Sequence, residues 1–378
     1  MKINRKIKNS LKGETVFEKL KPTDQKTAEY RAVADLYHGF FTGIMLTIVT
    51  RRGVQDASEF TYWLFRHKHE EQFIPGLKKL GIQDLPVPVA SAQFHYLANS
   101  IGEVKVEYMY ESDQKAWIRY PPPRYAWDDA AIAGIPTAVN RAMLRGWHGQ
   151  NGISLGNPKV GFVCTKMTMD GQSGLEGYFY EFDHELEPAE RVQYRRDEEG
   201  PVFDPGAAPL LPSRDWPEER LQKALRNFGL DWWRSMTIEA INLFGPPDGR
   251  YLSGTAGTLI GLHYYERIVR TLEISGSDAT SFGELMIRLG RGQGEEMLME
   301  KDGDAVIIRQ LDWRMMRDHP DPHPVAFEAW NRLWEGLLAA HNPRLRLDVL
   351  QRMDLGDDYF EWSISPRRPS RIGRRKAG

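Results

Sequence analysis

The density of glycine over residues 146–182 is the feature that most restricts how this chain can fold. The stretch of 37 residues contains eight glycines, together with Trp147, His148 and the only cysteine of the chain, Cys164. Glycine adopts backbone conformations that a side chain forbids, so this density predicts tight turns or a backbone that approaches a ligand closely. Residues 340–365 repeat the outline of the stretch with fewer glycines. The pair predicts two halves of similar design, of which the first holds the working pocket.

Periodicity supports this division, because the same order of elements is expected twice. Apolar residues recur at helical spacing over 27–49 and 58–80, and long helices are expected again over 217–243 and 251–274. After each pair of long helices the pattern predicts a short helix, a hairpin, an amphipathic helix and a second hairpin. The halves therefore share one sequence of elements.

Three landmarks recur at nearly one offset. The turns of the first hairpins lie about 190 residues apart, His148 and His341 lie 193 apart, and Gly171 and Gly356 in the second hairpins lie 185 apart. Such regular spacing predicts an internal duplication. The expected fold is α+β, with two related domains that each pack a helical layer on a small antiparallel sheet of hairpins.

Composition marks the expected boundaries of these domains. The expected units are a flexible basic lead-in over 1–23, a first α+β domain with the candidate pocket over 24–184, a proline-rich linker over 185–216, a second α+β domain over 217–365, and a basic tail over 366–378.

Charge and apolar content limit the expected partners. The total charge is −2, and residues 1–21 contribute +5 and residues 366–378 contribute +6, so the remaining 344 residues sum to −13. We expect no nucleic-acid partner, because such binders have a basic folded body. The longest apolar run, Gly39–Val49, is too short to cross a bilayer, so we expect no membrane partner. A single cysteine and the absence of a secretory signal favour a cytoplasmic protein of bacterial type, with a small-molecule substrate and optionally a second copy in a homodimer.

The strongest candidate for chemistry is the segment from Trp147 to Asn151, at an expected helix end. His148 can act as a general base, with Asn151 orienting it or a substrate carbonyl and Trp147 beside the substrate. The structural alternative is a histidine that interacts with the carbonyl groups of a helix C-terminus. His341 occupies a similar place in the other half, which favours that alternative, but only the first copy is rich in glycine.

Cys164 is a second candidate, as a thiolate nucleophile with His148 as its partner. In the expected strand it shares a face with Val160 and Phe162, so a buried, unreactive thiol is the alternative.

The first expected hairpin carries three polar candidates. Glu107, Arg119 and Tyr120 can face a pocket beneath the short helix, and an arginine beside a tyrosine suits a carboxylate substrate. Exposed strand residues give the same pattern. His95 lies between aromatic residues on the short helix, which predicts a core or pocket-lining residue.

The sequence predicts neither a metal site nor a cofactor. His67 and Glu71 would share one face of a helix without a third ligand, so residues 66–71 are expected to form a solvated, charged face. The glycines at 290, 292 and 294 follow an expected helix, which is the wrong context for phosphate or dinucleotide binding.

The order of helices, hairpin, helix and closing hairpin resembles the superfamily of four-vinyl-reductase-type domains, which includes the TRAPP vesicle-tethering subunits. It is also similar to the L-2-amino-thiazoline-4-carboxylate hydrolase family. The resemblance is carried by the closing hairpins, RMDLGDDYFEWSI and TKMTMDGQSGLEGYFYEF, over about a fifth of each half. It implies a small-molecule pocket between helices and sheet, in proteins that are variously sensors, tethers and hydrolases. Cys164 is the only cysteine available for the metal or substrate sites of such families, so no site residue is transferred.

These patterns predict an enzyme that acts by hydrolysis or lysis on a small cyclic or aromatic metabolite bearing a carboxylate. His148 would be its acid or base, Asn151 its oxyanion or substrate contact, and Arg119 its carboxylate anchor. The alternative is a non-catalytic small-molecule-binding or assembly module.

Overall fold

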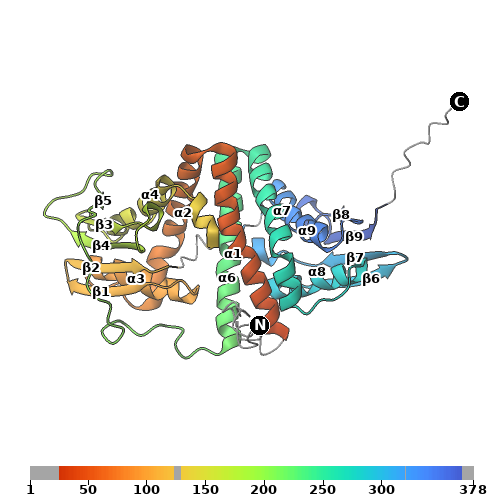
Figure 1. The fold of residues 1–378 in the computed structure, drawn as a ribbon, viewed down its shortest axis with the longest axis horizontal. Helices are drawn as coiled ribbons and strands as arrows, with labels where there is room; N and C mark the ends of the chain where they lie inside the picture. The colour runs from red at the N-terminus through yellow and green to blue at the C-terminus, as the bar shows by residue number, and fades with distance from the viewer. Residues whose placement is uncertain (1–24, 123–128, 320, 368–378) are drawn as a thin grey trace, which may run out of the picture.

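The fold is α+β, as expected, with 55% helix and 17% strand. The computed structural model describes residues 25–122, 129–319 and 321–367 (Figure 1). The expected lead-in over 1–23 and all but the first two residues of the basic tail lie outside the described residues.

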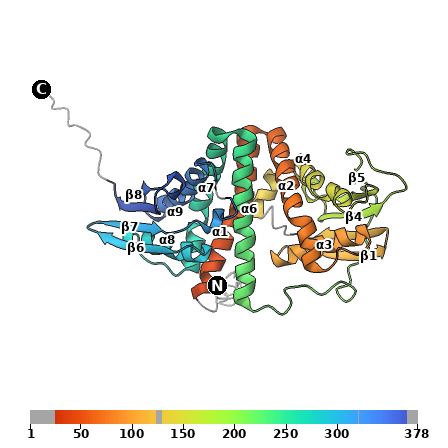
Figure 2. The same ribbon diagram turned by 180° about the vertical axis from the view of Figure 1, so that it is seen from behind.

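Long helices occupy the middle of the molecule, with one α+β unit on either side (Figures 1 and 2). These helices are α1 (Gln25–Arg52), α2 (Val54–Leu80), α6 (Glu218–Phe244) and α7 (Pro246–Thr271). α1 packs against α6 and α7. Two glycines of α1 permit the close approach of α7, since a Cβ atom would lie 2.5 Å from Tyr264 at Gly39 and 2.7 Å from Ile260 at Gly43. The central layer therefore joins the two halves.

The apolar character of α1 follows from this central position. By length and composition alone, α1 could cross a membrane, but 72% of its most apolar window is buried inside the protein. Val33, Leu36 and Ile44 are completely buried. The core helix of a folded domain has the same composition, because every face of it meets other apolar groups.

The first α+β unit packs α3 (Val87–Ile101) and the segment around α4 on a five-stranded sheet. The strands lie in the order β1-β2-β4-β3-β5. The remaining elements are β1 (Glu107–Ser112), β2 (Lys115–Tyr120), η2 (Asp129–Gly134), α4 (Thr137–Gly146), η3 (His148–Gln150), α5 (Asn151–Ser154), β3 (Val160–Lys166), η4 (Thr168–Asp170), β4 (Leu175–Glu181) and β5 (Val192–Tyr194).

The first sheet departs from the expected antiparallel arrangement at β5. This strand pairs parallel to β3, with Val192 opposite Phe162 and Tyr194 opposite Cys164, so the sheet is mixed. β5 lies within residues 185–216, which composition predicts to be a linker without regular structure. Three residues are too short for a recognisable period, and their pairing depends on β3 rather than on local sequence.

The second unit contains a four-stranded antiparallel sheet in the order β6-β7-β9-β8. Its elements are α8 (Ala279–Gln293), β6 (Met297–Asp302), β7 (Ala305–Gln310), η5 (Arg314–Met316), α9 (Val325–His341), β8 (Leu345–Gln351), η6 (Met353–Leu355) and β9 (Phe360–Pro366). The hairpins expected in this half, β6–β7 and β8–β9, are confirmed.

Four strands follow the same order in both sheets, and glycines with positive φ occupy similar places in the two halves. Gly53 and Gly245 each join two long helices at positive φ, 92° and 81°. Gly171 and Gly356 each end a short 3₁₀ helix inside the closing hairpin, at φ 78° and 104°. These angles favour glycine, because a residue with a side chain strains its own backbone at positive φ.

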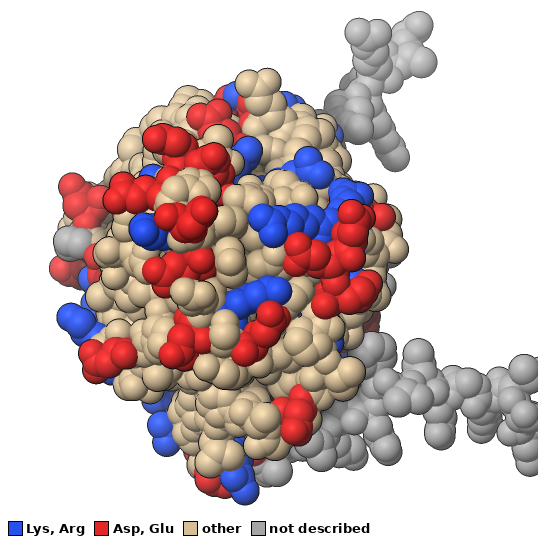
Figure 3. Space-filling view, turned by 90° about the vertical axis from the view of Figure 1, so that its left-hand side faces the viewer, with Lys and Arg blue, Asp and Glu red and all other residues tan. Residues whose placement is uncertain are grey.

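Charges of both signs cover the outer end of the first unit. Figure 3 views this end, and Asp and Glu side chains lie among Lys and Arg across the visible face. On the outer side of the sheet, Arg119 pairs with Glu107 and Glu176, and Lys115 pairs with Glu111. The visible face therefore carries mixed charges rather than one basic patch.

Candidate functional site

Two histidines stack at the centre of the first unit. His95 of α3 and His148 of η3 are both buried, and their ring centroids lie 4.2 Å apart with an interplanar angle of 9°. Phe179 of β4 lies nearly parallel to both rings, 5.7 Å from His95 and 5.9 Å from His148. The segment after α4 and the inner face of the sheet thus bring together residues that lie far apart in the sequence.

Hydrogen bonds connect His95 to two of the expected site residues. The hydroxyl oxygen of Tyr120 lies 3.0 Å from Nδ1 of His95, and the side-chain nitrogen of Asn151 lies 3.5 Å from Nε2. In the tautomer that lets the Asn151 amide donate to Nε2, His95 donates from Nδ1 to Tyr120. Burial lowers the pKa of His95 to about 3, with a smaller contribution from nearby His69. The ring is therefore neutral at neutral pH.

A third buried histidine, His69 of α2, was not expected at this site. Its ring stacks on Phe73 at 4.7 Å and meets Trp147 edge-on at 5.5 Å. Burial and, to a lesser extent, the charge of Arg66 lower the pKa of His69 to about 4, against an opposing contribution from the nearby Asn151 side chain. The expected solvated face over 66–71 is therefore wrong for His69, and also for Lys68, whose exposures are 1% and 2%.

A cavity of about 120 Å³ opens beside this cluster, between α2, α3, α4 and α6. Its lining residues are Phe41, Phe65, Gln72, Phe94, His95, Ala98, Asn99, Val104, Tyr120, Met143, Trp147, His148, Phe228 and Trp232. Within the described part of the chain, the lining contains no lysine, arginine, aspartate or glutamate. The indole N–H of Trp147 is buried and has no hydrogen-bond partner among the described residues. The cavity therefore offers aromatic walls and neutral hydrogen-bonding groups.

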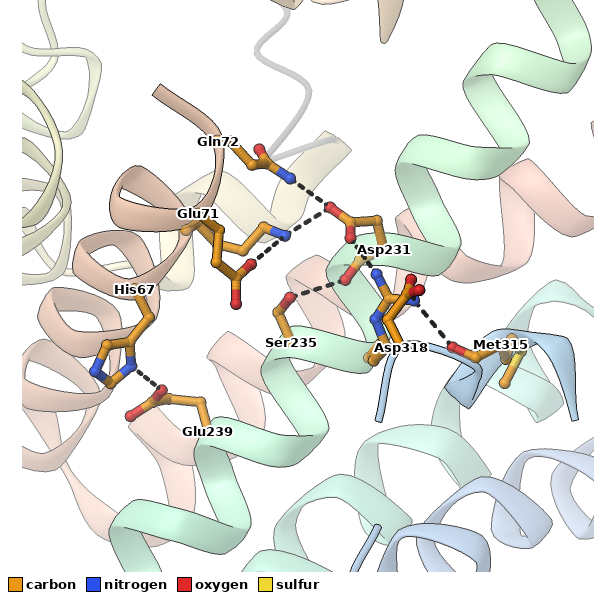
Figure 4. A network of polar contacts seen from close by, with 10 residues as sticks. His67, Glu71, Gln72, Asp231, Ser235, Glu239, Met315 and Asp318 are labelled. Carbon is orange, nitrogen blue, oxygen red and sulfur yellow. Dashed lines mark hydrogen bonds and ion pairs between the residues drawn. The ribbon is translucent and has the colours of Figure 1, made fainter. Parts of the chain in front are cut away.

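A polar network joins the cavity to the interface between the halves (Figure 4). Gln72 lines the cavity and donates to Oδ2 of Asp231 on α6 at 2.8 Å. The buried ammonium group of Lys68 donates to the same oxygen at 2.7 Å, while Arg234 donates to Oδ1 at 2.7 Å. Arg234 also donates to the carbonyl oxygen of Met315 in the second half at 3.1 Å. One carboxylate thus links both halves to the cavity wall.

The structure corrects the expectation that Arg119 and Glu107 share a pocket with Tyr120. Neighbouring strand residues point to opposite faces of a sheet, and only Tyr120 lies with the core beneath α3. The Arg119 guanidinium donates from Nε to Glu176 at 2.5 Å and from Nη1 to Glu107 at 2.8 Å. Burial alone would raise the pKa of Glu176, but hydrogen bonds from Arg119, the Gly200 backbone and other groups hold it below the usual range.

Cys164 lies in the core on the same face of β3 as Phe162, with an exposure of 2%. Its thiol donates to the carbonyl oxygen of Lys166 at 3.3 Å. This environment matches the buried-thiol alternative.

His148 and His341 lie in different local structures, although their spacing in the sequence predicts equivalent positions. η3 and α5 separate His148 from β3, whereas α9 continues unbroken to His341, shortly before β8. Nδ1 of His341 lies 2.8 Å from the hydroxyl of Tyr265, and its Nε2 lies 3.0 Å from the carbonyl oxygen of Asp278. His341 therefore ties α9 to α7 and the start of α8, whereas His148 stacks beside the cavity.

Over residues 25–122, 129–319 and 321–367, no three His, Cys, Asp or Glu side chains are grouped so that they could hold a metal ion. Comparisons with protein-family models, curated proteins and solved structures find no match to this chain.

Proposed function

We propose that the first half binds a small, uncharged ring compound in the cavity beside His95, as a ligand-binding module rather than as a hydrolase. The observation that carries this proposal is the cavity itself, whose described lining combines six aromatic hydrocarbon or indole side chains with neutral polar groups and no charged one. Ligand sites commonly combine an apolar wall with a few polar groups that fix orientation.

The size of the cavity favours a single ring. A volume of about 120 Å³ is close to that of an apolar cavity that accommodates benzene. The neutral polar side chains of the lining, such as Gln72 and Asn99, favour a ligand that carries a hydrogen-bonding group. The preferred ligand is therefore a neutral aromatic or cyclic molecule with such a group.

A carboxylate group on the ligand is not favoured. Burial of an unpaired carboxylate is strongly unfavourable, and Arg119, the expected anchor, is committed to Glu176 and Glu107. The proposed ligand is therefore cyclic, as the sequence predicts, but carries no carboxylate.

Hydrolysis or lysis is a second candidate, favoured by the contact of 3.0 Å between Tyr120 and His95. His95 itself accepts protons poorly at neutral pH, because its pKa is about 3. Catalysis would therefore depend on His148 as acid or base and Asn151 as substrate contact. Turnover that disappears in His148→Ala while ligand binding persists would favour this candidate.

We also propose that the halves arose by internal duplication. The shared strand order and the two glycine pairs support this proposal. So do two cross-strand ion pairs, Arg119–Glu176 and Arg309–Glu361, which occupy matching positions in the two sheets. A tandem of four-vinyl-reductase-type domains, whose members include sensors, would agree with a binding role.

Native mass spectrometry of the freshly purified protein tests ligand binding. We expect a small adduct that is lost on denaturation, and uptake of neutral ring compounds by adduct-free protein. Ala98→Leu places extra bulk in the cavity wall and should abolish uptake, whereas Ala339→Leu, at an exposed position of α9, should not. Uptake that survives Ala98→Leu unchanged would refute the assignment of this cavity.

A further inference from the structure

A larger cleft lies in the second half and shares no lining residue with the first-half cavity. It has a volume of about 480 Å³ and is formed by α7, α9 and β8. This volume is within the range of typical small-molecule sites. The cleft is therefore large enough for a ligand of its own.

Small residues of α7 line the cleft where, under the proposed duplication, α2 carries aromatic ones. Gly254 and Thr255 follow Gly245 at the same distances at which Tyr62 and Trp63 follow Gly53. Gly254 also leaves room for the stem of Arg332, whose Cγ atom would lie 3.0 Å from a Cβ at that position. The second half thus forms a groove where the first half carries two rings.

Charges of both signs are held along this cleft. The side chains of Arg250 and Arg332 are 57% and 52% exposed, and those of Glu328 and Glu335 are each 35% exposed. Glu328 accepts from Arg250 at 2.9 Å and from Arg352 at 3.5 Å. The carboxylate of Glu328 is therefore held by two arginine side chains.

The second carboxylate is also held by two residues. Glu335 accepts from Asn331 at 3.0 Å and from Arg332 at 2.5 Å. Two partners restrict each carboxylate to one orientation, which reduces the ordering required when a ligand binds. Half-exposed ion pairs are weak, so a ligand group can replace one partner.

An apolar surface completes the cleft. Phe327 is almost fully buried, and the guanidinium of Arg352 lies 4.5 Å above its ring. Val349 and Tyr251 also line the cleft, and the side chain of Tyr251 is 53% exposed. An apolar side chain of a ligand would find contacts here that the charged groups cannot provide.

We propose that this cleft binds a zwitterionic small molecule of the α-amino acid class with an apolar side chain. Its carboxylate pairs with Arg250 and Arg332, its ammonium group pairs with Glu328 and Glu335, and its side chain lies beside Tyr251 and Val349. A ligand with a single charge would displace one partner of these ion pairs and leave the other partner without a complement. This site is independent of the ring compound proposed for the first half.

Isothermal titration calorimetry of the full chain tests the proposal in two steps. A panel of the standard amino acids identifies the preferred side chain, and we expect an apolar one such as phenylalanine. The preferred amino acid is then compared with the two analogues that lack its ammonium or its carboxylate group. Each analogue should bind roughly tenfold or more weakly, because one set of charge-assisted contacts is lost. Absence of binding across the panel, or equal affinity for the analogue without the ammonium group, would overturn the proposal.

Matched variants locate the site. Arg332→Gln and Glu328→Gln should each weaken binding roughly tenfold. Arg270→Gln, at an exposed arginine of α7 outside the cleft, should leave the affinity unchanged. Ala98→Leu should also leave it unchanged, because that residue lines the other cavity. If Arg332→Gln and Glu328→Gln bind as tightly as the unaltered chain, the cleft is not the site.

Discussion

At the level of single residues, a substitution of Arg119 can distinguish a structural role of this side chain from a ligand-binding role. Its partner Glu176 is completely buried, and an unpaired buried carboxylate is strongly destabilising. We expect Arg119→Met to lower the free energy of unfolding by about 2–3 kcal/mol, because some hydrogen bonds to Glu176 remain. Ligand uptake by the cavity should not change. Urea unfolding measures the loss, and Arg309→Met provides the matched change at Glu361 in the second sheet. A variant of normal stability that no longer takes up ligand would restore Arg119 as an anchor.

The buried histidines predict a loss of stability in mild acid. The pKa values of His95 and His69 are lowered to about 3 and about 4, whereas histidine in an unfolded chain titrates near 6.5. Between these values the unfolded state binds more protons than the folded state, so the stabilisation present above pH ~6.5 falls as the pH decreases. Each histidine contributes up to about 1.4 kcal/mol per pH unit in this window.

Urea unfolding at several pH values between about 7 and about 5 measures this dependence. His69→Gln and His95→Gln should each reduce the slope of unfolding free energy against pH, even if their stability at neutral pH is lower. Slopes equal to that of the unaltered chain would show that these histidines titrate normally in the folded protein.

Residue patterns predicted only part of the site. Glycine density directed attention to the segment that carries Trp147, His148 and Asn151, and the first two of these residues line the cavity. The burial of Lys68 involves Asp231 and Trp232 of α6, and that of His69 involves Trp147, so no local pattern reveals either. The opposite directions of Arg119 and Tyr120, by contrast, follow from the two-residue period of a strand and were accessible from the sequence.

Among secondary-structure elements, β5 supports the segment that carries His148. Val192 of β5 is 7% exposed, and a Cβ at Gly149 would lie 2.9 Å from its Cγ2 atom. Val192→Ala should lower the free energy of unfolding by about 2 kcal/mol, since two buried methyl groups are lost. It should also weaken ligand uptake, because the backbone beside His148 loses its support. Thermal unfolding and native mass spectrometry measure the two effects.

The control is Val202→Ala, at a side chain that is 92% exposed and lies in the same connection between the halves. This change should leave stability and uptake unaltered. If both variants behave alike, β5 contributes nothing to the site.

Element order was predictable to the extent that elements are long or joined by tight turns. The long helices and hairpins have enough residues to display a period, and glycines mark most of their ends. β5 displays no period in three residues, and its parallel partner β3 lies outside any local turn. The cavity and the cleft were not predictable, because each depends on side chains from several elements that packing brings together.

For the whole molecule, the sequence halves are not the packing units. α1 precedes the first α+β unit in the chain but packs against α6, α7 and α8. The hydroxyl oxygen of Tyr37 on α1 accepts hydrogen bonds from the indole N–H of Trp330 and the amide of Gln293, both at 2.9 Å. One hydrophobic cluster includes residues of both halves. We therefore expect the chain to unfold as one cooperative unit.

Tyr37→Phe tests this expectation. The variant keeps the buried ring but leaves the donors of Trp330 and Gln293 without their shared acceptor, so the free energy of unfolding should fall by about 2 kcal/mol. Both contacts join the first helix of the chain to the second half. Calorimetry of the variant should therefore still show a single unfolding transition, at a lower temperature than in the unaltered chain. Two transitions, of which only one moves in the variant, would show that the halves unfold independently.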